Sequence, residues 1–88
     1  MIGQVVYSKA GRDCGRVFVI TRLEGNFAYL SDGGLRPLSH PKKKKHRHIQ
    51  PTKAVWEGEL PTQDKDIKKF LNDYRSLTIE VIEVIEVK

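Results

Sequence analysis

The stretch "GQVVYSKAGRDCGRVFVI", residues 3–20, decides the fold class of this chain. Residues 2–8 are rich in β-branched and aromatic side chains and predict a strand, which ends at residues 9–15, where two glycines provide the backbone freedom of a turn. Residues 16–22 follow and contain the unbroken apolar run "VFVI". Such a run is typical of a strand covered on both faces, as in a small closed barrel.

Glycine-containing turns divide the next part of the chain into further strands. Residues 24–26, Glu-Gly-Asn, predict a hairpin turn, and residues 27–31 predict a third strand. Residues 32–34, Asp-Gly-Gly, predict a second tight turn before a short fourth strand over residues 35–38. This order predicts an up-and-down meander. Because strands of a small barrel must fill its interior, the aromatic side chains on them are expected in the core: Tyr7, Phe18, Phe27 and Tyr29.

Residues 62–75 have the period of a helix, with Thr62 or Asp64 as candidate caps. Acidic side chains in the first turn and Arg75 in the last suit the helix dipole. Its apolar stripe is expected to pack against the barrel or Trp56, and a partner-binding face is the alternative. The stripe consists of Ile67, Phe70, Leu71 and Tyr74.

The last twelve residues, "LTIEVIEVIEVK", combine Ile and Val with a glutamate at every third position. Their β-branched composition favours a strand, so the chain is expected to end in a β-prone tail. A strand left uncovered would be an edge open to pairing, and we therefore expect it to pair with the barrel or with another copy of the chain. Self-association through residues 54–88 is a hypothesis on this basis.

The charge of this 88-residue chain is unevenly distributed. The net charge is +5 and the pI about 9.5, but residues 1–53 hold eleven Lys and Arg against three acids, or +8, and residues 54–88 hold five against eight, or −3. We predict a basic barrel domain over residues 1–53 and an acidic helix with its C-terminal extension over residues 54–88. A field of positive sign favours nucleic acid or an acidic membrane as the partner of the first part.

The segment "HPKKKKHRHIQP", residues 40–51, concentrates this positive charge. Taken alone, this segment has three interpretations: a solvated loop, a nuclear localisation signal, or one wall of a site for a polyanion. The nearby His40, His46 and His48 are not expected to bind a metal ion, because no cysteine or carboxylate is positioned beside them and the lysines repel a cation. The segment indicates that the partner is a polyanion, but it does not indicate which nucleotide sequence is bound.

The single cysteine, Cys14, excludes an internal disulfide and a cysteine-based metal cluster. Neighbouring arginines would favour its thiolate, but a chain of this size offers little pocket and no nearby histidine, so no catalysis and no cofactor are expected. No stretch approaches the ~18 apolar residues of a membrane span. We expect a soluble, cytoplasmic protein that does not bind membranes.

Residues 3–20 resemble the KOW motif, a strand, glycine-containing loop and strand found in large-subunit ribosomal proteins and transcription elongation factors. The stretch "YLSDGGLRPLSHPKKKKHRHIQP", residues 29–51, also resembles the archaeal and eukaryotic ribosomal proteins with an N-terminal KOW barrel and their short bacterial homologues. Gly15 stands at the characteristic glycine of the motif, whereas Cys14 stands where lysine is common. The resemblance covers residues 1–52 and implies a mainly β, five-stranded SH3-like barrel that binds ribosomal RNA at the large subunit.

Basic side chains of the first loop and of the lysine-rich segment are the expected phosphate contacts, with histidines available to stack on unpaired bases. Glycines of the loop would let its backbone approach a phosphate closely. The acidic half is expected to point away from RNA. The alternatives are a protein-interaction module and a transcription-elongation accessory. The candidate RNA-binding residues are Lys9, Gly11, Arg12, Gly15, Arg16, Arg36, Lys42, Lys43, Lys44, Lys45, His46, Arg47 and His48.

Overall fold

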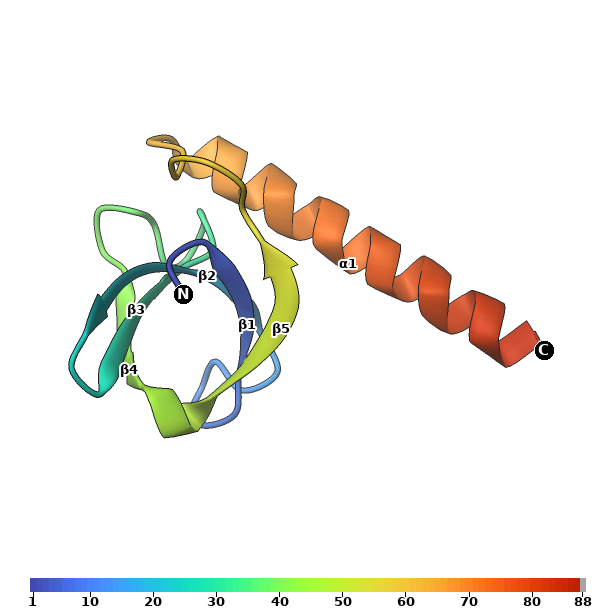
Figure 1. The fold of residues 1–88 in the computed structure, drawn as a ribbon, viewed down its shortest axis with the longest axis horizontal. Helices are drawn as coiled ribbons and strands as arrows, with labels where there is room; N and C mark the ends of the chain where they lie inside the picture. Colours follow the sequence, from blue (N-terminus) through green and yellow to red (C-terminus); the bar gives the residue numbers. More distant parts are fainter. Residues whose placement is uncertain (88) are drawn as a thin grey trace.

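The chain forms one five-stranded antiparallel sheet and one long helix (Figure 1). This computed structural model describes the backbone of residues 1–87 and the side chains of residues 1–76. The predicted mainly β fold with a single helix is confirmed. The elements are β1 (Gln4–Ser8), β2 (Val17–Glu24), β3 (Phe27–Ser31), β4 (Lys42–Lys45), the 3₁₀ turn η1 (His46–His48), β5 (Ile49–Val55) and α1 (Asp64–Val87).

The sheet has the strand order β4-β3-β2-β1-β5 and curls into a barrel-like ring, as Figure 1 shows. Its two edge strands, β4 and β5, are joined directly by η1. A β-bulge between Ile20 and Arg22 in β2 contributes to the bend. The inside of the ring is filled by a cluster of buried apolar side chains: Val6, Phe18, Ile20, Ala28, Leu30 and Ile49.

The fourth strand is not where the sequence predicts it. Residues 35–38 form turns and irregular chain, and the fourth strand is Lys42–Lys45, which pairs with β3 from Leu30↔Lys42 to Phe27↔Lys45. Lysine has a low β-propensity, so this strand is not recognisable from its own composition. The free hydrogen-bonding edge of β3 pairs with the segment and overrides that local preference.

The fifth strand, β5, was implied by the family resemblance but has a weak signal of its own. It contains Pro51, which cannot donate to a strand ladder and argues against a central strand. Here Pro51 lies opposite Val6 of β1, and β5 is an edge strand with no sheet neighbour on its other side. A proline is tolerated at such a position because no partner strand requires its N–H.

Helix α1 packs on the outer face of β1 and β2. Ile67 and Leu71 are 0% and 1% exposed and lie in a second core with Val5, Val17 and Val19. The run "VFVI" is therefore covered on both faces, as predicted, by the ring interior and by the helix. The predicted helix stripe is confirmed.

The start of the helix is held by two long-range contacts. Trp56 packs edge-to-face on Phe70, with ring centroids 5.0 Å apart, which confirms its predicted role as an anchor between helix and barrel. The carboxylate of Asp64 accepts a hydrogen bond of 2.7 Å from the backbone N–H of Leu38. Asp64, a candidate cap in the sequence, thus ties the first helical turn to the β3–β4 loop.

The strand predicted for residues 77–88 is wrong over residues 77–87, where the backbone continues α1. Once the first turns of the helix are fixed by packing, each further residue adds a hydrogen bond at low entropic cost, and this overrides the modest β-preference of Ile and Val. Residue 88 lies outside the described part of the chain. Among the residues that the structure describes, no helix is both long and apolar enough to cross a membrane.

Candidate nucleic-acid interface

The β1–β2 loop, residues 9–16, is closed by its own backbone hydrogen bonds. The N–H of Ser8 donates to the carbonyl of Arg16 at 3.0 Å, and the N–H of Gly15 donates to the carbonyl of Ser8 at 2.8 Å. Gly11 and Gly15 have φ angles of +76° and +85°, which L-residues with a side chain rarely adopt. The two predicted glycines therefore shape the loop, and Lys9 and Arg12 are exposed on it.

The carboxylates near the loop are turned inward or paired. Asp13 is 5% exposed, and its Oδ2 lies 3.2 Å from the Nη2 of Arg36. Asp32 pairs with Arg16 at 3.3 Å and also accepts hydrogen bonds from the N–H groups of Gly34 and Arg36. Arg36 and Arg16, two predicted phosphate contacts, are therefore engaged in holding the β1–β2 and β3–β4 loops together.

The lysine strand lies directly beside this loop. Lys44 of β4 is only 9% exposed, and its Nζ donates to the carbonyl of Ala10 at 2.5 Å. The same Nζ is 3.5 Å from the point where a Cβ on Gly11 would stand. The two cationic segments of the sequence, 34 residues apart at this contact, are thus adjacent.

The turn η1 lies between the β2–β3 turn and the β1–β2 loop. The N–H of His46 donates to the carbonyl of Asn26 at 2.9 Å, and the N–H of Lys9 donates to the carbonyl of His48 at 2.8 Å. The exposed basic side chains of β4, η1 and the first loop consequently follow one another around this end of the ring. We call this set the basic belt, and it consists of Lys9, Arg12, Lys43, Lys45, His46 and Arg47.

Of the thirteen candidate residues, these six are exposed on the belt. Lys42 and His48 are half-buried beside it, at the two ends of the β4–η1 segment. Lys44 is turned inward, because successive side chains of a strand point to opposite faces. The structure thus separates residues that can reach a ligand from residues that position them.

Two aromatic side chains expected in the core lie elsewhere. Phe18 is buried as predicted, and Tyr7 is half-buried but packs against the second core. The prediction is wrong for Phe27 and Tyr29, which are half-buried and alternate with the inward-facing Ala28 and Leu30 of β3. A β-strand with one solvent-facing side requires this alternation. The outer face of β3 and β4 therefore presents aromatic rings, a feature the sequence analysis missed although the period-two pattern of β3 contains it.

Two basic side chains lie close to these rings. The Nζ of Lys43 lies 4.4 Å from the ring centroid of Phe27 and 5.9 Å from that of Tyr29, and the guanidinium of Arg22 lies 5.3 Å from the Tyr29 centroid. Cation–π contacts of this kind hold long basic side chains on the sheet surface. Next to them, a groove of about 540 Å³ is lined by Asn26, Phe27, Lys45, His46 and Arg47. Rings and cations together are the groups that hold unpaired bases and their phosphates.

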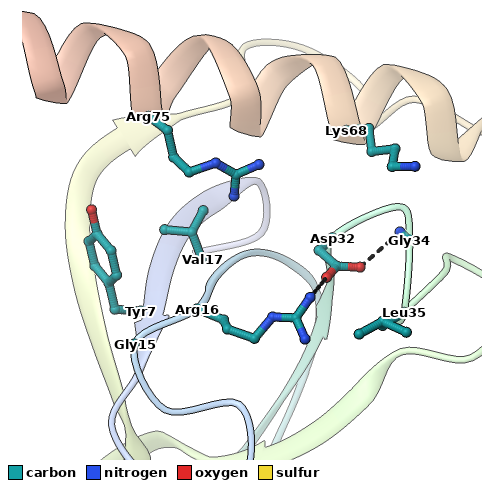
Figure 2. Close-up of a pocket in the computed structure, with 9 residues that line it drawn as sticks. All are labelled: Tyr7, Gly15, Arg16, Val17, Asp32, Gly34, Leu35, Lys68 and Arg75. Carbon is teal, nitrogen blue, oxygen red and sulfur yellow. Dashed lines mark hydrogen bonds and ion pairs between the residues drawn. The ribbon is translucent and has the colours of Figure 1, made fainter.

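A larger pocket of about 660 Å³ lies between α1 and the sheet (Figure 2). Arg16, Asp32 and Leu35 border it from the loops, and Figure 2 shows Arg75 and Lys68 reaching over it from the helix. Lys68 and Arg75 were not among the predicted site residues. They are seven residues apart and so share one helix face, but the sequence does not reveal that this face lies beside the first loop.

Tyr7 forms a wall of the same pocket, and its hydroxyl donates to that of Tyr74 at 3.3 Å. The pKa of Tyr7 is raised above its ordinary value, first because of this hydrogen bond and then because of partial burial. Tyr7 is therefore neutral at physiological pH and adds no negative charge to the pocket.

Because Lys44 is buried and bonded to the backbone, its replacement should destabilise the fold more than replacement of the neighbouring Lys45. Lys44→Ala should lower the free energy of unfolding by about 2 to 3 kcal/mol, because the Ala10 carbonyl loses a charged donor and a buried alkyl chain is removed. Lys45→Ala, on the same strand but exposed, should change it by less than about 0.5 kcal/mol. Urea unfolding of both variants checks this, and equal losses would contradict the assigned role of Lys44.

Within the described residues, no group of three His, Cys, Asp or Glu side chains is placed to hold a metal ion. Cys14 is a free, exposed thiol. Comparison of the chain with models of known protein families and with curated protein sequences finds no match. The resemblance to the KOW motif therefore stays a prediction from residues 3–20 and 29–51.

Proposed function

We propose that this protein is a non-enzymatic RNA-binding protein of the KOW type, which holds phosphates of structured RNA on the basic belt. The observation that carries the proposal is the contact between the two cationic segments, through Lys44 Nζ with the Ala10 carbonyl and Lys9 N–H with the His48 carbonyl. These bonds fix the spacing of the exposed cations. Fixed spacing reduces the entropy lost when a polyanion binds.

The inward position of the nearby carboxylate supports the same proposal. Asp13 is buried against Arg36, so its charge is compensated inside the protein while Lys9 and Arg12 of the same loop stay exposed. Phosphate contacts of Lys and Arg supply most of the affinity of a nucleic-acid-binding protein and position it on its ligand. The belt has the charge and the exposure for this role.

The aromatic rings on the outer face of β3 favour RNA with unpaired bases over a uniform polyanion. Phe27 lines the groove beside Lys45, His46 and Arg47. Unpaired bases in loops and bulges stack on aromatic side chains, which is how most sequence-selective RNA recognition is achieved. Ribosomal RNA at the large subunit, the ligand implied by the KOW resemblance, is rich in such structured single-stranded elements.

The salt dependence of binding tests the proposed function. Affinity for a structured RNA hairpin should fall steeply as the salt concentration rises, with a log–log slope of about −3.5 to −4.5 if the five lysines and arginines of the belt each contact a phosphate. Fluorescence anisotropy of a labelled hairpin measures this slope at salt concentrations from about 50 to 200 mM, over which a protein with several phosphate contacts loses most of its affinity. Absence of RNA binding, or binding without a salt slope, would contradict the proposal and favour a peptide-binding module.

The proposed ribosomal location has a separate test. In a gradient-fractionated lysate, the protein should sediment with large ribosomal subunits, and crosslinking in cells followed by sequencing should recover ribosomal RNA. Sedimentation with RNA polymerase instead would replace the ribosomal assignment by that of a transcription-elongation accessory. The RNA-binding proposal itself would stand in that case.

A further inference from the structure

The pocket between α1 and the sheet is built from three parts of the chain. Arg16 comes from the end of the β1–β2 loop, Asp32 and Leu35 from the β3–β4 loop, and Lys68 and Arg75 from the helix (Figure 2). Its volume of about 660 Å³ is in the range of small-molecule sites in proteins. The helix residues that line this pocket, Lys68 and Arg75, do not belong to the basic belt.

The charges that line the pocket leave an excess of positive charge. Three cationic side chains, Arg16, Lys68 and Arg75, face one carboxylate, that of Asp32. The Oδ1 of Asp32 accepts two backbone N–H groups, and its Oδ2 pairs with Arg16. Each oxygen of the carboxylate thus has a partner inside the protein, and the net charge of the lining favours an anion.

The helix cations remain available to a ligand. The Nη2 of Arg75 donates to the Oδ1 of Asn72 at 2.5 Å, a neutral partner that leaves its charge uncompensated. Lys68 is exposed and forms no ion pair with any side chain that the structure describes. Both lie on one flank of α1, beside the buried positions Ile67 and Leu71, because residues seven apart return to the same face after two turns. The flank that carries them is therefore fixed by packing of the helix.

The pocket and the basic belt both contain residues of the β1–β2 loop. Lys9 and Arg12 of the β1–β2 loop belong to the belt, and Gly15 and Arg16 line the pocket. Exposed apolar surface at the pocket, that of Leu35 at 72% exposure, could cover a ribose or the edge of a base. The β1–β2 loop thus connects the belt with the pocket beside the helix.

We propose that the pocket between α1 and the β1–β2 loop binds a phosphodiester group of the same RNA, with Lys68 and Arg75 as its contacts from the helix. This inference rests on the proposed function and extends it, because it makes the helix of the acidic half a second wall of the RNA site. A chain whose residues 54–88 carry a net charge of −3 thereby places two of its cations against the basic loop. In this proposal the helix of the acidic half contributes to the RNA site, in contrast to the expectation that it points away from RNA.

Two double variants with the same change in charge test this inference. Lys68→Gln with Arg75→Gln removes the pocket cations, and Lys65→Gln with Lys69→Gln removes two exposed cations of the same helix that do not line the pocket. The pocket variant should lower the magnitude of the salt slope by about 1.4 to 1.8 and weaken RNA binding more than tenfold at ~0.1 M salt. The control should lose much less affinity than the pocket variant, because neither Lys65 nor Lys69 lines the pocket.

Fluorescence anisotropy with the same RNA hairpin gives both values, and thermal unfolding shows that each variant is folded. A charge-preserving pair, Lys68→Arg with Arg75→Lys, should keep the salt slope, which a purely structural role of these residues does not predict. Equal losses in the pocket and control variants, or no loss in either, would overturn the inference while belt-dependent binding continued. If the unaltered protein binds no RNA, the proposed function fails and this inference with it.

Discussion

Replacing Gly33 by alanine should lower the free energy of unfolding by about 4 kcal/mol or more, a loss typical of severe overpacking in a protein interior. A Cβ at this position would stand 2.3 Å from the backbone oxygen of Asp64 and 3.0 Å from the backbone nitrogen of Lys68. Both are backbone atoms of α1, so no side chain can rotate to make room. The helix must shift away from the β3–β4 loop, which separates Ile67 and Leu71 from their core.

A second glycine separates this steric effect from backbone strain. Gly33 and Gly58 have similar φ angles, +75° and +82°, but a Cβ on Gly58 would meet no atom within 4 Å. Gly58→Ala should therefore lower the free energy of unfolding only by the strain of an alanine with a positive φ angle, about 1 to 2 kcal/mol. Urea unfolding followed by circular dichroism measures both. If the two variants lost the same free energy, the close docking of α1 on the β3–β4 loop would be incorrect.

The second large effect concerns RNA affinity. The triple variant Lys9→Gln, Lys43→Gln, Lys45→Gln should bind RNA at least about a hundredfold more weakly at ~0.1 M salt and should reduce the magnitude of the salt slope by about 2 to 3. These three lysines are exposed and come from the loop and from β4, the two segments that the Lys44 contact brings together. Their replacement leaves that contact intact, so the fold is expected to be retained.

A matched control distinguishes a defined belt from general positive charge. Lys53→Gln, Lys65→Gln, Lys69→Gln changes the net charge by the same amount at three exposed lysines of β5 and α1. This variant should lose less than about tenfold in affinity, because none of its three side chains belongs to the belt or lines the pocket. Comparable losses in the two triple variants would mean that net charge alone attracts RNA and that the belt is not the binding surface.

The local sequence determined the strand–loop–strand unit of residues 3–20 and the helix stripe. Hydrophobic periodicity is a property of neighbouring residues, so the run "VFVI" and the positions of Ile67 and Leu71 could be assigned correctly. The glycines of the first loop were likewise recognisable, because only their backbone conformation permits the turn. The uneven charge also followed directly from counting residues.

The tertiary structure alone decided which basic and aromatic residues form a surface. Four consecutive lysines have no strand signal, yet pairing with β3 makes them a strand and turns Lys44 inward under Ala10. The same pairing places Phe27 beside Lys45. Packing of α1 then sets Lys68 and Arg75 opposite Arg16, more than fifty residues away in the chain. These relations depend on contacts between distant segments, and no pattern within a short window of sequence contains them.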